Sequence, residues 1–149
     1  MLRSRVGAVR PVGEFFDFKR VSKPRNAAEA QARVIYNLSY FSANYAIVFA
    51  MLSIYSLLTN LVLLFTLIFV SAALYGIAYL KGQDLNLGFT RLTTSQLYVG
   101  LFVIALPLGI YASPFSTILW LLGAAGVTII GHAAILDKPI ESAFSEQAV

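Results

Sequence analysis

The sequence predicts an all-α integral membrane protein: four hydrophobic helices in two tight hairpins, preceded by a cytosolic basic leader and a short helix. Only 12% of the 149 residues are charged and 58% are hydrophobic, whereas about a quarter of a soluble domain is charged. Residues 46–80 and 92–136 contain no Asp, Glu, Lys or Arg. Each stretch exceeds the roughly 20 residues that one spanning helix needs, and a break near its middle divides it into two segments.

The leader is basic, is interrupted by proline and ends in a predicted short helix. Asn26 is expected to be the N-cap, because Glu29 follows three residues later as in a capping box. The alanines that follow favour a helix. We expect this helix to continue without a break into the first membrane segment, near Leu38–Leu58. The leader lacks the apolar core of a cleavable secretory signal, so none is expected.

Two uncharged turns divide the apolar stretches. The first lies at Leu58–Asn60 and the second at Ser113–Pro114, because Pro114 cannot continue a helix without losing a backbone hydrogen bond. The leader holds eight Lys or Arg and three Asp or Glu, so the positive-inside rule places leader, central loop and tail in the cytosol. The expected parts are the leader at 1–33, the first hairpin at 34–80, the central loop at 81–95, the second hairpin at 96–136 and the tail at 137–149.

Enzyme chemistry is not expected from these residues. The chain has no cysteine and a single histidine, His132, whose segment holds no acid with which it could build a metal site. No cofactor or metal is therefore predicted. The absence of carboxylates within the apolar segments also argues against a solute transporter. The His132 ring is expected to bond a neighbouring backbone group or Thr128, with a partner contact or pH-sensitive packing as the alternative.

Small residues crowd the fourth apolar segment, and Ala124, Thr128 and Gly131 share one face of it. Membrane helices use such faces to bring their backbones close together. This face packs either within the bundle or against another membrane protein. The residues assigned to membrane-helix packing are Gly123, Ala124, Thr128, Gly131 and His132.

The stretch "RVIYNLSYFSANYAIVF" carries a polar stripe into the first membrane segment. Arg33, Asn37, Tyr40 and Asn44 recur at spacings of four, three and four, so they line one helical face. Tyrosine and asparagine suit a membrane interface, but Asn44 lies about one turn deeper than anchoring requires. A buried amide needs a hydrogen-bond partner. We therefore expect this face to meet protein, either a neighbouring helix or a client.

The leader also carries the aromatic run "EFFDFKR". Phe15, Phe16 and Phe18 lie beside Lys19 and Arg20, a composition that suits anchoring on an anionic leaflet. Packing of the same rings against the hairpins or against a partner is the alternative.

Three motifs point to a family. "RPVGEFFDFKRVSKP", "RVIYNLSYFSANY" and "GHAAILDKPIE", with two uncharged hairpins between the last two, resemble the prenylated Rab acceptor family, most of all its fungal, Yip-interacting branch. The resemblance covers residues 10–149, and Arg10, Pro11 and Glu14 are among the matching positions. The leader is shorter than in the family pattern. By this resemblance the partner-binding residues are Phe15, Phe16, Asp17, Arg33, Asn37, Tyr40, Phe41, Asn44 and Tyr45.

The resemblance implies a membrane adaptor of the endoplasmic reticulum, the Golgi and transport vesicles, with both termini cytosolic. Such a protein receives prenylated Rab GTPases, displaces GDP-dissociation inhibitor, and associates with Yip-type and reticulon-like membrane proteins. The other expected partner is the lipid bilayer; no nucleic acid is expected, and a homo-oligomer is left open. The alternative function is structural, with hairpins that wedge one leaflet and shape the membrane together with reticulon-like partners.

Overall fold

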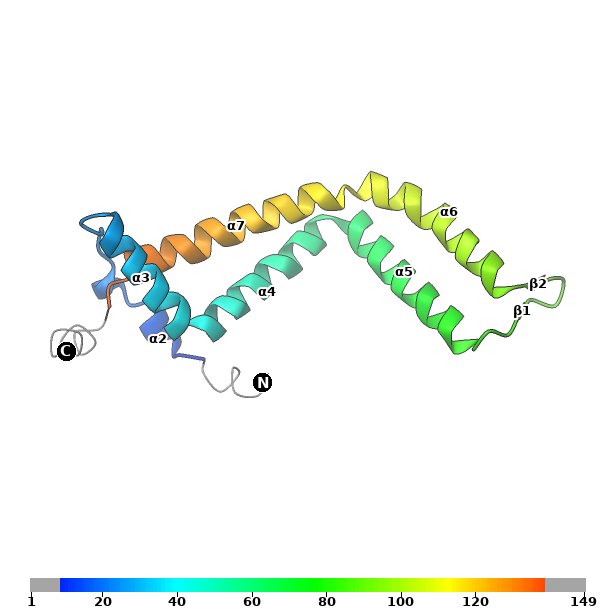
Figure 1. Ribbon diagram of the computed structural model, residues 1–149, viewed down its shortest axis with the longest axis horizontal. Coiled ribbons are helices and arrows are strands. Elements are labelled where there is room, and N and C mark those ends of the chain that lie inside the picture. The colour runs from blue at the N-terminus through cyan, green and yellow to red at the C-terminus, as the bar shows by residue number, and fades with distance from the viewer. Residues whose placement is uncertain (1–8, 139–149) are drawn as a thin grey trace. The chain divides into compact units, whose positions relative to one another are not determined.

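The computed structural model describes residues 9–138, and it is helical apart from one very short pair of strands (Figure 1). Four helices are long and apolar enough to cross a membrane: α4 (Ser42–Thr59), α5 (Leu61–Tyr79), α6 (Thr94–Ala112) and α7 (Pro114–Ile135). The predicted class, an all-α integral membrane protein with four hydrophobic helices, is confirmed. Their many exposed apolar side chains suit a lipid environment, in which helices satisfy their own backbone hydrogen bonds.

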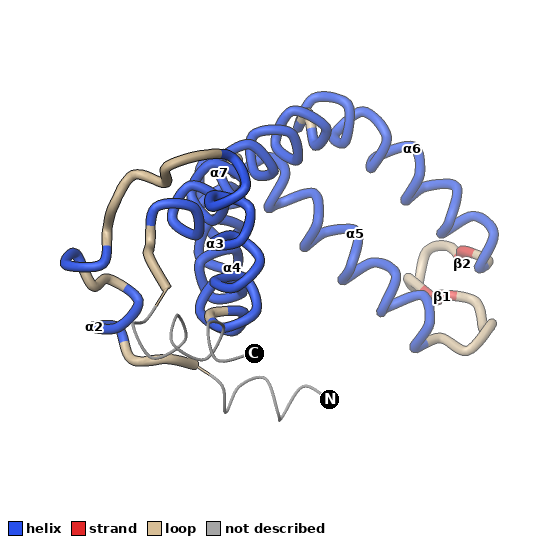
Figure 2. The backbone as a smooth tube through the Cα atoms, turned by 60° about the vertical axis from the view of Figure 1, so that its left-hand side comes forward, coloured by secondary structure: helices blue, strands red, loops and turns tan. Residues whose placement is uncertain are grey.

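The described chain divides into two compact units. Residues 9–53 and 121–138 belong to the first unit, and residues 54–120 form the second. The first contains α2 (Val12–Phe15), the 3₁₀ helix η1 (Phe18–Arg20), α3 (Ala27–Tyr40), the start of α4 and the end of α7. Figure 2 shows the short helices and loops that join these elements.

Helix α3 begins where the sequence predicts. The Asn26 Oδ1 atom accepts the Glu29 backbone N–H at 2.8 Å, which caps the helix. The reciprocal bond of the predicted capping box is displaced by one residue, because the Glu29 carboxylate accepts the backbone N–H of Arg25 at 3.0 Å. This bond is the main cause that lowers the pKa of Glu29.

The expected continuous helix from the leader into the membrane is wrong. Helix α3 ends at Tyr40 and α4 begins at Ser42, with Phe41 between them at φ −100° and ψ 23°. The chain changes direction there (Figure 1). Phe41 is completely buried, within the apolar core of the first unit. Tertiary packing of this ring therefore overrides the local preference for an unbroken helix.

In the second unit, α5 and α6 pack against each other across the central loop (Figure 1). The loop contains β1 (Leu85–Asn86) and β2 (Arg91–Leu92), which pair antiparallel with Leu85 opposite Leu92. Thr93 and Gln96 form a capping box that starts α6. The pairing of α4 with α5 and of α6 with α7 in two hairpins stays a prediction, and the contact within this unit joins α5 and α6.

Both predicted turns coincide with helix ends, and one side chain links them. Asn60 caps α5 through its Oδ1 atom, which accepts the Leu63 N–H at 3.1 Å. Its Nδ2 atom donates to the Ala112 carbonyl oxygen at 2.7 Å and to Thr117 Oγ1 at 3.0 Å. The first turn is thereby bonded to the second, which contains Ser113 in the left-handed region at φ 52°.

Candidate functional site

The candidate site lies in the first unit and is built around the docked leader, which we define as residues 10–22. Phe15 is its central anchor, exposed by only 5%. The ring centroid of Phe15 lies 5.2 Å from that of Phe41 and 5.3 Å from that of Tyr45, in edge-to-face geometry. Such aromatic pairs contribute about 0.5–1.5 kcal/mol beyond their buried area. The leader is thus packed on the α3–α4 junction.

His132, near the end of α7, bonds the docked leader on one side and α4 on the other. Its Nε2 atom lies 2.8 Å from the Phe15 carbonyl oxygen, and its Nδ1 atom lies 2.7 Å from the Tyr45 hydroxyl. A carbonyl oxygen can only accept, so Nε2 carries a proton; in the neutral ring this leaves Nδ1 to accept from the Tyr45 hydroxyl. The imidazole also stacks on the Phe15 ring at 4.3 Å between centroids. The expected bond from His132 to a backbone group is confirmed; its partners are Phe15 and Tyr45 rather than Thr128.

Asn37 binds the end of α7. It is fully buried, and its Nδ2 atom donates to the carbonyl oxygens of Ala133 and Leu136, both at 2.8 Å. The last carbonyls of a helix have no partner within the helix, so this amide satisfies groups that would otherwise be unpaired. Because both partners are acceptors, the nitrogen has to face them. The Oδ1 atom has no hydrogen-bond partner within the described part of the chain.

The Asn44 side chain makes two reciprocal hydrogen bonds with the backbone of Arg10, as a residue of a neighbouring β-strand would. The Arg10 N–H donates to Asn44 Oδ1 at 2.8 Å, and Asn44 Nδ2 donates to the Arg10 carbonyl oxygen at 2.9 Å. An amide side chain has one donor group and one acceptor in this arrangement, and both are used. The expectation that this polar face meets protein is confirmed for Asn37 and Asn44. The protein they meet is the chain itself.

Tyr40 joins the leader from α3. Its hydroxyl donates to the Glu14 carboxylate in a short hydrogen bond, and the Arg10 guanidinium lies 4.2 Å from its ring centroid. The bond to Glu14 is the main cause that raises the pKa of Tyr40, with burial as the next. A cation over an aromatic face contributes about 0.5–1 kcal/mol at an exposed site. Arg10 therefore contacts the face of the Tyr40 ring, and Glu14 binds its hydroxyl.

Arg33 holds the end of the docked leader. Its side chain is 5% exposed, and its Nη1 and Nη2 atoms donate to the Ser22 carbonyl oxygen at 2.8 Å and to Ser22 Oγ at 3.0 Å. Nη2 also lies 2.7 Å from the Glu29 carboxylate, and Asp137 lies 3.7 Å away. A buried charge requires such partners. Arg33 is therefore a structural contact of the leader in this unit.

A short backbone ladder closes the site. Val21 and Leu136 form an antiparallel bridge, in which the Ser22 N–H donates to Ile135 at 2.9 Å and the Asp137 N–H donates to Arg20 at 2.8 Å. The Arg20 guanidinium adds two bonds to the Asp137 carbonyl oxygen, at 3.1 and 2.6 Å. The leader is thus hydrogen-bonded to α3, α4 and the residues that end α7.

The sequence model of the family described as "PRA1 family protein" matches residues 4–146. The chain belongs to the PRA1 family. Prenylated Rab acceptor 1 of Saccharomyces cerevisiae is 51% identical to it over 148 residues, which are 99% of this chain and 84% of the yeast protein. PRA1-like protein of Schizosaccharomyces pombe is 47% identical over 89% of this chain and 78% of that protein. Prenylated Rab acceptor protein 1 of Rattus norvegicus is 34% identical over 98% of this chain and 78% of the rat protein. No solved structure matches the chain.

Most of the predicted partner-binding residues of this PRA1 family protein lie in the interior of the first unit. The buried ones are Phe15, Arg33, Asn37, Phe41, Asn44 and Tyr45. Phe16 is 53% exposed, Tyr40 is partly buried, and Asp17 accepts the Lys19 backbone N–H at 3.1 Å, which caps η1. The structure brings the buried residues together around the docked leader. Direct contact of any of them with a partner stays a prediction.

The small residues assigned to helix packing lie apart from this site, with the exception of His132. Gly123, Thr128 and Gly131 are exposed and Ala124 is partly buried. A Cβ atom added at Gly123 or Gly131 would meet no described atom within 4 Å. These glycines therefore make no close backbone contact within the described chain of this PRA1 family protein. Packing against a second membrane protein stays a prediction.

Sequence reasoning missed the partners that α7 supplies to the leader. Leu136 and Asp137 were not singled out, and Arg10 and Glu14 were named only as matching the PRA1 family. One signal was present: the motif "EFFDFKR" and the motif "GHAAILDK" are both expected at the cytosolic ends of the apolar segments. Two polar motifs at the same membrane face are candidates for contact.

Proposed function

We propose that this protein is a membrane adaptor that receives prenylated Rab GTPases in vesicle traffic between the endoplasmic reticulum and the Golgi. The observation that carries the proposal is the 51% identity, over 99% of this chain, to a yeast protein named Prenylated Rab acceptor 1. That name states what the yeast protein accepts, and a likeness of this extent supports the same role here.

The docked leader supports a role in GTPase contact. Its buried residues fix it to three helices, while Val12, Phe16 and Phe18 remain 71%, 53% and 82% exposed. Lys19 and Lys23 are exposed beside them. Aromatic side chains next to cations, held on a rigid support, are typical of surfaces that bind another protein. In this proposal, Asn37, Asn44 and Tyr45 act indirectly, by holding that surface.

Displacement of GDP-dissociation inhibitor requires that the prenyl chain of the Rab leaves the inhibitor for another apolar environment. Each CH₂ group of a prenyl chain costs about 0.8 kcal/mol when it is exposed to water, so a soluble carrier releases the chain only to another apolar environment. A membrane protein that binds the GTPase at the bilayer surface supplies that environment at the same place. Yip-type and reticulon-like proteins are proposed to bind the exposed small-residue face of α7, where close backbone approach is unobstructed.

The test uses the full chain in lipid nanodiscs and a prenylated Rab presented as its complex with GDP-dissociation inhibitor. Wild type is expected to retain the Rab and release the inhibitor, and unprenylated Rab to bind less well. Replacing both exposed rings, F16S with F18S, should weaken retention by about tenfold, which corresponds to ~1.4 kcal/mol. The matched control is F89S, since Phe89 is 88% exposed in the central loop.

Two results contradict the proposal. If wild-type nanodiscs retain no more prenylated Rab than empty nanodiscs do, the chain is not a Rab acceptor. If F89S lowers retention as much as the double leader variant, the leader is not the GTPase-binding surface.

A further inference from the structure

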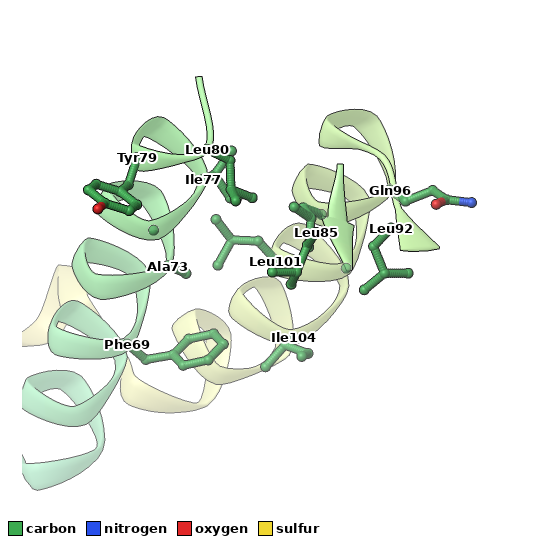
Figure 3. A pocket seen from close by; sticks show the side chains of 13 residues that line it. Phe69, Ala73, Ile77, Tyr79, Leu80, Leu85, Leu92, Gln96, Leu101 and Ile104 are labelled. Carbon is green, nitrogen blue, oxygen red and sulfur yellow. The ribbon is translucent and has the colours of Figure 1, made fainter. Parts of the chain in front are cut away.

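The second unit contains an apolar cavity between α5 and α6, separate from the docked leader. Its volume is about 520 Å³, within the range of roughly 300–1,000 Å³ usual for small-molecule sites. Helix α5 lines it with Phe69, Ala73 and Ile77, and α6 with Leu101 and Ile104. Figure 3 shows these side chains around a common space.

The chemistry of the wall limits what the cavity can hold. Gln96 and Tyr79 are the polar side chains among its lining residues, and Figure 3 shows the Gln96 amide directed away from the space. No lining residue is charged. A charged or hydrogen-bonding group of a ligand placed against this wall would find few polar partners there. The cavity therefore fits a pure hydrocarbon chain.

The central loop covers the end of this cavity. Leu85 and Leu92 both line it, and they are directly opposite each other in the β1–β2 pair. Residues opposite each other in an antiparallel pair project to the same face, and Figure 3 shows Leu85 beside Leu101. Lys81 and Arg91 place basic charge in the same loop, on the side where the positive-inside rule expects the cytosol. A chain delivered from the cytosol would reach the cavity past this loop.

Small residues leave room in the wall. Gly76 on α5 and Gly100 on α6 both line the cavity, and a Cβ atom added at either would meet no described atom within 4 Å. The first atom of a side chain can therefore be added there without a collision. The space is open in the folded unit and can be filled by substitution.

We infer that the α5–α6 cavity is the binding site for the isoprenoid chain of a prenylated Rab, an inference that rests on the proposed function. Two observations support an isoprenoid chain as the occupant. The cavity wall is almost entirely hydrocarbon, and the relatives are named as acceptors of prenylated Rab.

The test uses the full chain in nanodiscs and a geranylgeranyl-cysteine methyl ester whose isoprenoid carries a photoreactive diazirine. Illumination is expected to label residues of α5 and α6 that line the cavity. The filled variant A73L with G100L should reduce this labelling by about tenfold, which corresponds to ~1.4 kcal/mol. The control is G109L on α6, since Gly109 does not line the cavity and an added Cβ atom there is equally unobstructed. Circular dichroism and thermal unfolding check that the variants keep their helices.

Competition separates the isoprenoid from bilayer lipid and does not depend on any variant. Unlabelled geranylgeranyl-cysteine should displace the probe, and an S-acylated cysteine of equal carbon number should displace it less well. Equal displacement by both would make the cavity a general site for lipid tails and would overturn the inference.

The outcomes for the two proposals are distinct. If wild type retains prenylated Rab while the probe labels residues outside the cavity, the inference fails and the proposed function stands. If wild type retains no prenylated Rab, the proposed function fails, and the inference that rests on it is overturned whatever the free probe labels.

Discussion

The side-chain nitrogen of Asn37 lies 2.8 Å from the carbonyl oxygen of Ala133, a residue 96 positions further along the chain. The same nitrogen bonds the carbonyl oxygen of Leu136. One buried amide on α3 therefore completes the end of α7. This contact links α3, near the start of the first unit, to the residues that end it.

Replacing Asn37 by leucine should destabilise the first unit. The two residues have similar size, so the change removes the donor and leaves two buried carbonyl oxygens unpaired. We expect a loss of about 1–3 kcal/mol, measured as thermal or denaturant unfolding in detergent micelles. The control is S39A on the exposed side of α3, which should stay within about 0.5 kcal/mol of wild type. Equal stability of N37L and wild type would show that the bond contributes nothing.

The protonation state of His132 can be read directly, because the chain contains one histidine. The bonds to Phe15 and Tyr45 predict a proton on Nε2 and, in the neutral ring, a lone pair on Nδ1 that accepts from the Tyr45 hydroxyl. Nitrogen-15 chemical shifts of histidine-labelled protein at neutral pH distinguish this tautomer from the other. A proton on Nδ1 would contradict the assigned roles.

Removing the Tyr45 hydroxyl should loosen the same contact. Y45F keeps the ring and its packing on Phe15 but deletes the donor to His132. We expect the variant to lose about 0.5–1.5 kcal/mol of stability, while the Phe15 carbonyl oxygen still holds a proton on Nε2. In a double-mutant cycle with H132N, a coupling near zero would show that the two residues act independently.

The bond between Tyr40 and Glu14 predicts a dependence of stability on alkaline pH. The pKa of Tyr40 is raised in the folded protein, so folding favours the protonated phenol. Its contribution is fully present below the usual tyrosine pKa of about 10 and is lost as pH rises through the raised value. The stability difference between wild type and Y40F should therefore shrink above about pH 10. The remaining tyrosines titrate in both proteins, so the difference isolates Tyr40.

Substitution of Glu14 supplies the control for that measurement. In E14Q the carboxylate that raises the pKa is absent, so the stability difference between Y40F and its parent should be smaller at neutral pH. A difference that stays constant from neutral to strongly alkaline pH would contradict the assignment.

The two turns distinguish spanning helices from a leaflet wedge. The chain has no cysteine, so each introduced thiol is unique. Leu61 and Phe115 lie next to the turns and are 66% and 71% exposed. In sealed microsomes, L61C and F115C should react with an impermeant maleimide only after permeabilisation, whereas Q83C in the central loop should react at once. Turns that stay unreactive after permeabilisation would favour the membrane-shaping alternative.

The sequence predicted the class, the start of α3 and the two turns between apolar helices, because each depends on nearby residues. The charge-free stretches, the Asn26 cap and the break before Pro114 each depend on residues within one or two turns. The polarity of Asn37 and Asn44 likewise predicted that their face meets protein. The sequence did not identify the partners, since Ala133 and Arg10 lie far away along the chain and offer backbone atoms, which every residue has.

The break at Phe41 and the contact between α5 and α6 could not be predicted for a related reason. A helix through residues 27–58 satisfies every local preference, and only the position of the Phe15 ring in the folded unit makes the interruption at Phe41 favourable. Similarly, α5 and α6 are apolar on all sides, so no polar stripe marks which of their faces should pair. In a bilayer, the apolar face that meets a helix and the one that meets lipid look alike.

The docking of the leader also sets an order of events during synthesis. Phe15 is made early, and its partner His132 is added 117 residues later. The contacts of the leader with α7 therefore cannot form until α7 has been synthesised, whereas its contacts with α3 and α4 can form earlier. A leader that makes all of these contacts thus belongs to a chain whose fourth apolar helix has been synthesised, so the surface that carries Phe16 and Phe18 gains its last support only when α7 is present.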